Sequence, residues 1–190
     1  MAICAILQDF LENQQIPHRG LKHPAAFTGH QLARALKLSA TEVVKSVLLR
    51  AAGGRFVVAL LPAALRIDLE RLREAVGTRT LRLAGEDEMH MLFPKCEVGA
   101  MCPFGVLCSM PLPMYADRSM TANAQVVLTA GVHTAAVRMG YADLERLLKP
   151  TVATFGVAGA DQAPGGAEGT DPVSLKSLGS DHPGSVASKP

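Results

Sequence analysis

Two apolar segments joined by a pair of glycines constrain the fold of this chain more than any other feature. Residues 43–50 and 55–62 are rich in β-branched and aliphatic side chains, and Gly53-Gly54 lies between them. Such a glycine pair is typical of a β-hairpin, because glycine adopts the left-handed backbone of tight hairpin turns at little cost. Both segments are apolar on both faces, so we expect the hairpin to lie inside a sheet.

The remaining pattern predicts helices packed around this sheet. Amphipathic periodicity predicts helices at residues 2–14, 31–36, 68–76, 86–93 and 141–148. Thr28 is a candidate N-cap of the second helix, and Asp68 and Gly77 mark the start and the end of the third. Strands are expected at residues 79–83, 106–108 and 114–116, and a second hairpin at 125–129 and 134–139. The order of these elements indicates an α/β (α+β-like) fold with a mixed, strongly curved sheet.

Composition changes near the C-terminal end of the chain. The 190 residues are 48% hydrophobic and 19% charged, as in globular domains. From Gly156 onward, Gly, Ala, Ser, Pro and Asp dominate and the apolar periodicity ends. We therefore expect one folded domain over residues 1–155 and a flexible tail over residues 156–190. The chain has no signal peptide and no apolar run long enough to span a bilayer, so we expect a cytoplasmic protein without a membrane partner.

Charge and motif content narrow the possible ligands. The formal net charge of +2 neither requires nor excludes a nucleic-acid partner. No recognition helix is visible, so we do not expect binding to duplex DNA. Cys96, Cys102 and Cys108 are six residues apart, whereas zinc sites usually contain close cysteine pairs. No nucleotide-binding fingerprint is present either, and we expect neither a metal nor a cofactor.

The segment 96–105 is the most unusual loop of the sequence. It contains too much glycine and proline for a helix or a central strand, yet Val98, Met101 and Phe104 make it too apolar for a solvated turn. A loop of this kind can line a small pocket and direct backbone N–H groups into it. We interpret this loop, the strand around Lys45 and the turn at residues 130–133 as parts of one site.

Lys45 is a charged residue in the interior of the first hairpin strand. Burial of an ammonium is costly unless an anion contacts it. Lys45 is therefore either an anion-binding residue at a pocket mouth, for a phosphate or a developing negative charge, or an edge-strand lysine that discourages aggregation. The sequence alone gives these two interpretations equal weight.

Other residues could contribute to chemistry or only to structure. Gly99, Gly105 and Gly131 could bring backbone N–H groups close to an oxyanion, or they could simply form turns. His133 could donate to a substrate carbonyl or act as a base. Cys102 and His133 could form a nucleophile–base pair, although their spacing does not single them out. Asp117 could orient a pocket residue or close a turn.

Several motifs occur in order along the chain. They are Val44-Lys45-Ser46-Val47-Leu48 before the glycine pair, Gly99-Ala100-Met101-Cys102-Pro103-Phe104-Gly105, Pro113-Met114-Tyr115-Ala116-Asp117, Ala130-Gly131-Val132-His133-Thr134 and Tyr141-Ala142-Asp143-Leu144-Glu145-Arg146-Leu147. Together they resemble the YbaK / prolyl-tRNA-synthetase-associated (ProX-like) family over about residues 10–155. The second motif is similar to the signature Gly-x-x-x-Pro-Phe-Gly loop of that family.

The resemblance implies a stand-alone editing domain with the fold of that family. Its members hydrolyse the ester of a misacylated tRNA in trans, typically alanyl- or cysteinyl-tRNA for proline. The characteristic lysine of the family corresponds to Lys45, where it would hold the phosphate of the terminal nucleotide. Such domains are thought to use ribose hydroxyls of the substrate, or the thiol of an attached cysteine, in place of a protein nucleophile. The implied partners are a mischarged tRNA and, as a further expectation, an aminoacyl-tRNA synthetase.

We therefore predict two sets of site residues. The predicted catalytic residues are Lys45, Gly99, Gly131 and His133. The predicted substrate-binding residues are Phe27, Thr28, Ala100, Met101, Cys102, Pro103, Phe104, Gly105 and Asp117. Two alternatives stay open, namely an inactive module of the same fold that binds tRNA or an aminoacyl group, and a thiol hydrolase that uses Cys102 and His133. Cys102 and Cys108-Ser109 depart from the family pattern, which leaves the substrate identity open.

Overall fold

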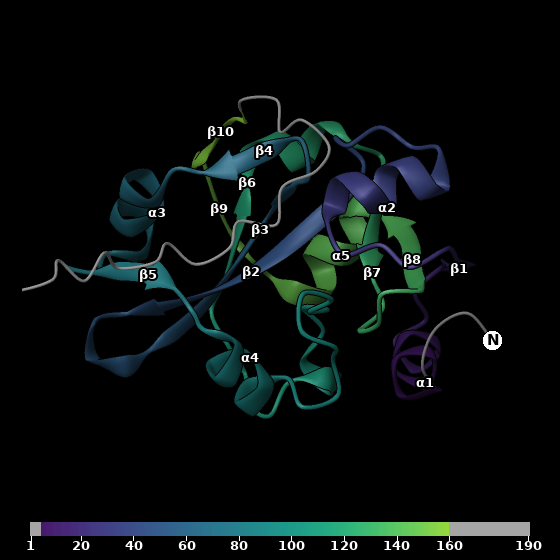
Figure 1. The fold of residues 1–190 in the computed structure, drawn as a ribbon, viewed down its shortest axis with the longest axis horizontal. Coiled ribbons are helices and arrows are strands. Elements are labelled where there is room, and N and C mark those ends of the chain that lie inside the picture. The colour runs from purple at the N-terminus through teal and green to yellow at the C-terminus, as the bar shows by residue number, and fades with distance from the viewer. Residues whose placement is uncertain (1–4, 160–190) are drawn as a thin grey trace, which may run out of the picture. The chain divides into compact units, whose positions relative to one another are not determined.

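The predicted hairpin forms the centre of the largest sheet in the computed structural model, which describes residues 5–159 (Figure 1). Strands β2 (Val44–Ala51) and β3 (Phe56–Pro62) pair antiparallel along their whole length. Gly53 and Gly54 turn the chain with φ values of 72° and 76°, in the region that glycine tolerates best. The sheet has the strand order β5-β2-β3-β6-β9, so both hairpin strands lie inside it, as their apolar pattern predicts.

The other strands make this sheet mixed. β5 (Leu81–Leu83) pairs antiparallel with β2. β6 (Met114–Asp117) runs parallel to β3, and β9 (Thr151–Ala153) runs parallel to β6. β4 (Leu65–Ile67) and β10 (Gly156–Ala158) form a separate antiparallel pair.

A second, antiparallel sheet has the order β1-β8-β7. Its strands are β1 (His18–Lys22), β7 (Gln125–Thr129) and β8 (Ala135–Gly140). A parallel bridge between Val43 and Val127 brings β7 to the start of β2. The turn between β7 and β8 is thereby held close to the central hairpin.

Five α-helices surround the sheets in the described part of the chain. They are α1 (Ala5–Asn13), α2 (Gly29–Leu36), α3 (Leu69–Val76), α4 (Glu86–Leu92) and α5 (Tyr141–Leu148). The predicted caps are confirmed. The Thr28 hydroxyl accepts from the Gln31 N–H, Asp68 caps α3, and Gly77 ends α3 with a φ of 66°. None of the helices within the described residues has the length and hydrophobicity needed to span a bilayer.

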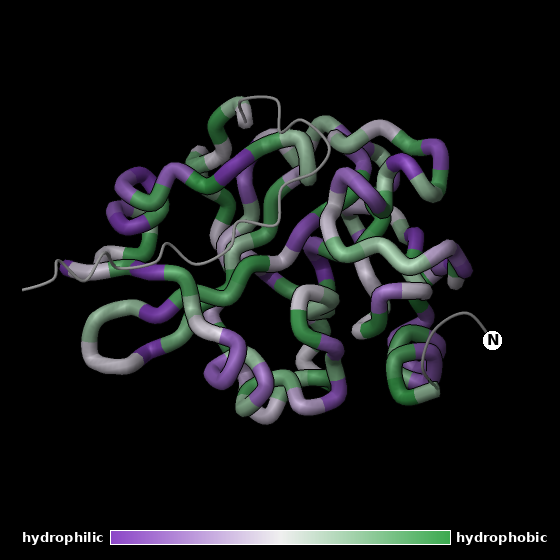
Figure 2. The backbone as a smooth tube through the Cα atoms, viewed as in Figure 1, coloured by the Kyte–Doolittle hydropathy of each residue, from purple (hydrophilic) through white to green (hydrophobic). Residues whose placement is uncertain are grey.

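The side chains of the central hairpin alternate between two apolar clusters. Leu48 and Leu60 pack into the larger cluster with residues of α1, α4 and the glycine loop. Leu49 and Leu61 pack on the opposite face with residues of α3 and with Phe155. Figure 2 shows hydrophobic and hydrophilic residues interleaved along the strands and helices, as expected of elements with a buried and an exposed side. Both faces of the hairpin are therefore covered by apolar packing, which holds the hairpin in place relative to the surrounding helices.

The structure corrects the sequence-based assignment at several short elements. The strand predicted at residues 106–108 is wrong, because Gly105–Leu107 forms a 3₁₀ turn in which the Cys108 N–H donates to the Gly105 carbonyl. β1 was expected to be an irregular connection, and β4 and β9 were not predicted. β10 begins one residue after the predicted domain boundary and pairs with β4, so residues 156–158 belong to the folded part. Residues 160–190 of the predicted tail lie outside the described residues.

Candidate active site

The site begins at a stretch of β2 with a neighbouring strand on one side only. β3 pairs with all of β2, whereas β5 pairs only with Leu49–Ala51. The chain then leaves the sheet after the Ala84 N–H donates to the Leu48 carbonyl, with a distance of 3.0 Å. Backbone groups of successive residues point to opposite edges of a strand, so the amides of Ser46 and Leu48, two residues apart, face the same edge. This open edge offers backbone polar groups to a ligand.

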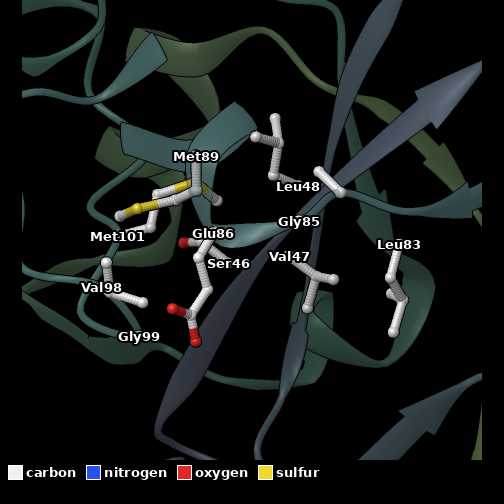
Figure 3. A pocket seen from close by; sticks show the side chains of 11 residues that line it. Ser46, Val47, Leu48, Leu83, Gly85, Glu86, Met89, Val98, Gly99 and Met101 are labelled. Atoms are coloured by element: carbon white, nitrogen blue, oxygen red, sulfur yellow. The ribbon is translucent and has the colours of Figure 1, made fainter. Parts of the chain in front are cut away.

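A pocket of about 220 Å³ lies beside this open edge (Figure 3). Three segments line it. They are residues of β2 (Ser46, Val47 and Leu48), residues from the end of β5 into α4 (Leu83, Ala84, Gly85, Glu86 and Met89), and residues of the glycine loop (Val98, Gly99 and Met101). Most of these side chains are aliphatic or thioether groups. The Ser46 hydroxyl and the Glu86 carboxylate are the polar side-chain groups of the lining. The pocket therefore suits a small apolar group with a few polar contacts.

The glycine loop reaches the pocket through a tight turn. The Ala100 N–H donates to the Glu97 carbonyl with a distance of 2.9 Å, and Gly99 occupies the third position of this turn with a φ of 84°. A positive φ at the third position is what a type II turn requires. A Cβ atom on Gly99 would also lie 3.4 Å from Cε1 of His133. That distance is an ordinary van der Waals contact, so it is the backbone conformation that favours glycine here.

Replacement of Gly99 with alanine is expected to destabilise the fold by about 1–2 kcal/mol, because alanine must adopt a left-handed conformation. For a chain of this size, the melting temperature should fall by about 2–4 °C per kcal/mol. Gly105→Ala is the matched control, because Gly105 does not have a positive φ and a Cβ atom there would meet nothing within 4 Å. Thermal unfolding of the two variants tests this expectation, and equal melting temperatures would contradict it.

The turn between β7 and β8 holds the glycine loop in place. The Glu97 N–H donates to the Gly131 carbonyl with a distance of 2.8 Å. The Thr129 hydroxyl lies 3.2 Å from the carbonyl oxygens of both Ala100 and Met101. Gly131 is buried with a φ of 89°, and a Cβ atom there would lie 3.4 Å from the sulfur of Cys96. The structure thus brings the three predicted segments together, with Gly131 behind the loop rather than in the pocket lining.

His133 connects the glycine loop to the segment before α2. Its Nδ1 lies 3.1 Å from the Ala26 carbonyl oxygen, and its Nε2 lies 2.9 Å from the Val98 carbonyl oxygen. Its backbone N–H donates to the Glu97 carboxylate with a distance of 2.7 Å. The ring of Phe27, which is 62% exposed, lies against the imidazole with a centroid distance of 4.5 Å. Both ring nitrogens thus contact backbone carbonyls, and His133 supports the rim of the pocket.

Lys45 immediately precedes the pocket-lining residue Ser46 and is half-buried. Burial lowers the pKa of its ammonium below the ordinary value of 10.5. None of the ion pairs among residues 5–159 includes Lys45. A lysine that only protected a strand edge would extend its ammonium into solvent. Half-burial without a carboxylate partner therefore favours an anion-binding role for Lys45.

Most of the other predicted substrate-binding residues do not line this pocket. Ala100, Cys102 and Phe104 are fully buried, and the Phe104 ring packs near that of Phe10, with 6.2 Å between centroids. Three further predicted residues have structural roles. Pro103 is buried, Gly105 starts the 3₁₀ turn, and Thr28 caps α2. Of the predicted set, Gly99 and Met101 contribute to the lining. The loop is apolar mainly because its second half packs into the core.

Asp117 serves the fold rather than the pocket. Its Oδ1 accepts from the Ser119 N–H at 3.0 Å and from the Ser119 hydroxyl. Its Oδ2 accepts from the N–H groups of Phe155 and Gly156, at 2.8 and 2.6 Å. Burial alone would raise the pKa of this carboxyl, but the hydrogen bonds outweigh it and hold the pKa below its ordinary value. Asp117 is absent from the pocket lining, so the predicted substrate contact becomes a turn-closing role.

An ion pair fixes the start of α4 against the central sheet. Arg50 of β2 and Arg82 of β5 are directly opposite each other, and both donate to the Glu88 carboxylate, with distances of 2.6 to 2.9 Å. Glu88 also accepts from the Gly85 N–H at 2.9 Å. The hydrogen bond from Arg82 is the largest of several that lower the pKa of Glu88 to about 2. Glu88 thereby keeps the two arginines together and sets the position of Glu86 at the pocket.

The sequence analysis missed the part of the pocket formed by the start of α4. Leu83, Glu86 and Met89 line the pocket. Acids in the first turn of a helix and apolar residues along it are already explained by helix formation, so in the sequence they did not indicate a pocket. Ser46 was part of the predicted strand motif without a role of its own. Within residues 5–159, His, Cys, Asp and Glu side chains do not gather in a group of three or more that could hold a metal ion.

Comparison with known proteins shows the family of this chain. The chain matches the family described as aminoacyl-tRNA editing domain over residues 23–147. It is 26% identical over 148 residues to the prolyl-tRNA editing protein ProX of Acetoanaerobium sticklandii, a match that spans 76% of this chain and 90% of that protein.

Solved structures share the same fold. A crystal structure described as a candidate trans-editing enzyme for prolyl-tRNA synthetase is 25% identical, with a TM-score of 0.71 over 80% of this chain and 96% of that chain. The crystal structure of a hypothetical protein is 20% identical, with a TM-score of 0.73 over 80% of this chain and 99% of that one. The match over residues 23–147 covers most of the folded part. The chain therefore belongs to the aminoacyl-tRNA editing domain family.

Proposed function

We propose that this protein is an aminoacyl-tRNA deacylase that hydrolyses the ester of a mischarged tRNA in trans. One observation carries the proposal, namely the small apolar pocket beside an open strand edge, with a half-buried lysine one residue before the lining residue Ser46 and without an ion-pair partner among residues 5–159. The 3′ end of an aminoacyl-tRNA combines an amino-acid side chain with a nearby phosphate. An apolar pocket and an anion-binding ammonium match these two features.

The proposed substrates are alanyl- or cysteinyl-tRNA for proline. A pocket of about 220 Å³ walled by Leu83, Met89 and Met101 accommodates a small side chain better than a large one. Hydrophobic sites separate side chains that differ by one methylene by only about 1–3 kcal/mol, so a synthetase needs a second site to remove smaller amino acids. The names of the relative from Acetoanaerobium sticklandii and of the candidate trans-editing enzyme support tRNA for proline and a synthetase as partners.

The proposed mechanism relies on positioning. Lys45 binds the phosphate of the terminal nucleotide, and the amino-acid side chain enters the pocket. Water adds to the ester carbonyl, the bond to the ribose oxygen breaks, and the free amino acid and the tRNA leave. Because the ester is already activated, orientation and backbone hydrogen bonds from the Ser46 edge and the Gly99 turn supply most of the rate.

The geometry disfavours the thiol-hydrolase alternative. Cys102 has a relative exposure of 0%, and the ring nitrogens of His133 contact the carbonyls of Ala26 and Val98. A nucleophile must reach the substrate and its base must be available to it. An inactive binding module of the same fold is the remaining alternative, and it differs only in the lack of turnover.

Release of amino acid from a panel of charged tRNAs tests the proposal. The panel contains tRNA for proline charged with alanine, cysteine, serine or proline. We expect alanyl- or cysteinyl-tRNA to be hydrolysed about 10- to 200-fold faster than prolyl-tRNA, the range that a hydrophobic pocket provides. Binding without hydrolysis of any substrate would favour the inactive module, and fastest hydrolysis of prolyl-tRNA would contradict the proposed specificity.

A further inference from the structure

The pocket contains a charged group that the proposed mechanism does not use. Glu86 lies at the start of α4, and its side chain extends into the space between the glycine loop and β2 (Figure 3). Val98 and Gly99 lie on one side of its carboxylate and Val47 on the other. Every other side chain of the lining is uncharged.

Glu86 differs from the other acids of the same helical turn. Glu88 is bound by Arg50, Arg82 and the Gly85 N–H, and it alone accounts for the capping of α4. Among residues 5–159, none of the hydrogen bonds or ion pairs described for the side chains involves Glu86. Glu86 is exposed as Asp87 is, but it differs from Asp87 in lining the pocket, so its carboxylate is open to a cationic group of a ligand that enters there.

A charge of opposite sign lies one residue before the lining residue Ser46. Lys45 comes from β2, next to Ser46, and Glu86 comes from α4. The 3′ end of an aminoacyl-tRNA also carries two opposite charges, a phosphate and the α-ammonium of the amino acid. An α-amino group has an ordinary pKa of about 7.7–8.0 and is mainly protonated at neutral pH. If Lys45 meets the phosphate, the ammonium is the complementary partner for Glu86.

We propose that Glu86 binds the α-ammonium of the aminoacyl ester and so restricts the site to substrates with a free amino group. This inference rests on the proposed function. An N-acylated aminoacyl group, as in formylated or peptidyl-tRNA, has no positive charge at this position. Such substrates would leave the Glu86 carboxylate without its partner, and the site would bind them more weakly.

The test compares two non-hydrolysable probes. One is 3′-alanylamino-3′-deoxyadenosine 5′-phosphate, and the other is the same compound with an acetylated α-amine. Titration calorimetry measures the affinity of each probe for the wild type, for Glu86→Gln and for the control Asp87→Asn. Asp87 is an exposed acid next to Glu86 that does not line the pocket.

We expect the wild type to prefer the free-amine probe by about 10-fold or more, the effect of one hydrogen bond between charged groups. Glu86→Gln should lose this preference and bind the acetylated probe as the wild type does, and Asp87→Asn should keep the preference. A preference that persists in Glu86→Gln, or no preference in the wild type, would overturn the inference. Because the readout is binding, absence of tRNA hydrolysis would reject the proposed function without deciding the role of Glu86.

Discussion

Replacement of Lys45 with alanine is expected to reduce hydrolysis of the preferred mischarged tRNA by about 100-fold or more, the effect of misplacing a reacting group. Lys45 is half-buried and takes part in no ion pair among residues 5–159, so we expect its main partner in the complex to be the substrate phosphate. Removal of the Lys45 ammonium leaves no buried carboxylate without its ion-pair partner among residues 5–159. The free energy of unfolding should therefore change by only about 0.5 kcal/mol.

Three variants separate the charge of Lys45 from its packing. Lys45→Met keeps an apolar side chain of similar length without the charge, and it should be as inactive as Lys45→Ala. Lys45→Arg keeps the charge with a different geometry, and partial activity is expected. Lys22→Ala, at an exposed lysine of β1, should behave as the wild type. Single-turnover deacylation and urea unfolding provide the two readouts, and full activity in Lys45→Met would remove Lys45 from the mechanism.

Asp117→Ala is expected to cause the largest loss of stability, about 3 kcal/mol or more, because it removes charged acceptors from buried donors. The carboxylate is 2% exposed and joins the end of β6 to Ser119 and to the backbone of Phe155 and Gly156. Without it, the N–H groups of Phe155 and Gly156 lose their acceptor. Asp9→Asn, at an exposed position of α1, serves as the control with an expected change within about 0.5 kcal/mol.

The contribution of Asp117 to the stability of the fold should also decrease as the pH falls. The pKa of its carboxyl is lowered in the folded protein from an ordinary value of 3.8, so between the two values the unfolded chain binds more protons. The stabilisation is therefore complete above pH 3.8 and is lost as the pH falls through the folded pKa. Urea unfolding at several pH values gives the free energy of unfolding of the wild type and of Asp117→Ala. The difference between these two free energies should become smaller in acid, and a difference that grew as the pH fell would contradict the lowered pKa of Asp117.

Local signals were enough to predict the elements that the sequence encodes strongly. The Gly53-Gly54 hairpin, the Thr28 cap and the α3 helix between Asp68 and Gly77 each combine an apolar pattern with residues suited to their backbone conformation. β4, β9 and β10 have only three residues each, too few to show a period. Their formation depends on partners far along the chain, such as Ile67 opposite Gly156.

The candidate site was predictable in its segments but not in its detailed lining. Lys45, Gly99 and Met101 were predicted, and the structure brings their segments together. An apolar loop residue can line a pocket or only fill the core. The sequence does not distinguish Met101, which lines the pocket as well as packing into the core, from Phe104, which packs into the core without lining the pocket. The proposed role of Glu86 depends on a helix start that the pair of Arg50 and Glu88 holds against β2. That arrangement is long-range and has no local signal.

The most direct test of the proposed site is a crystal structure of the protein with 3′-alanylamino-3′-deoxyadenosine 5′-phosphate. We expect the alanyl side chain in the pocket between Leu48, Met89 and Met101, with the phosphate within hydrogen-bond distance of the Lys45 ammonium. The pocket, the open edge of β2 and the glycine turn would then act together as the editing site. A probe bound elsewhere on the protein, with this pocket empty, would contradict the account.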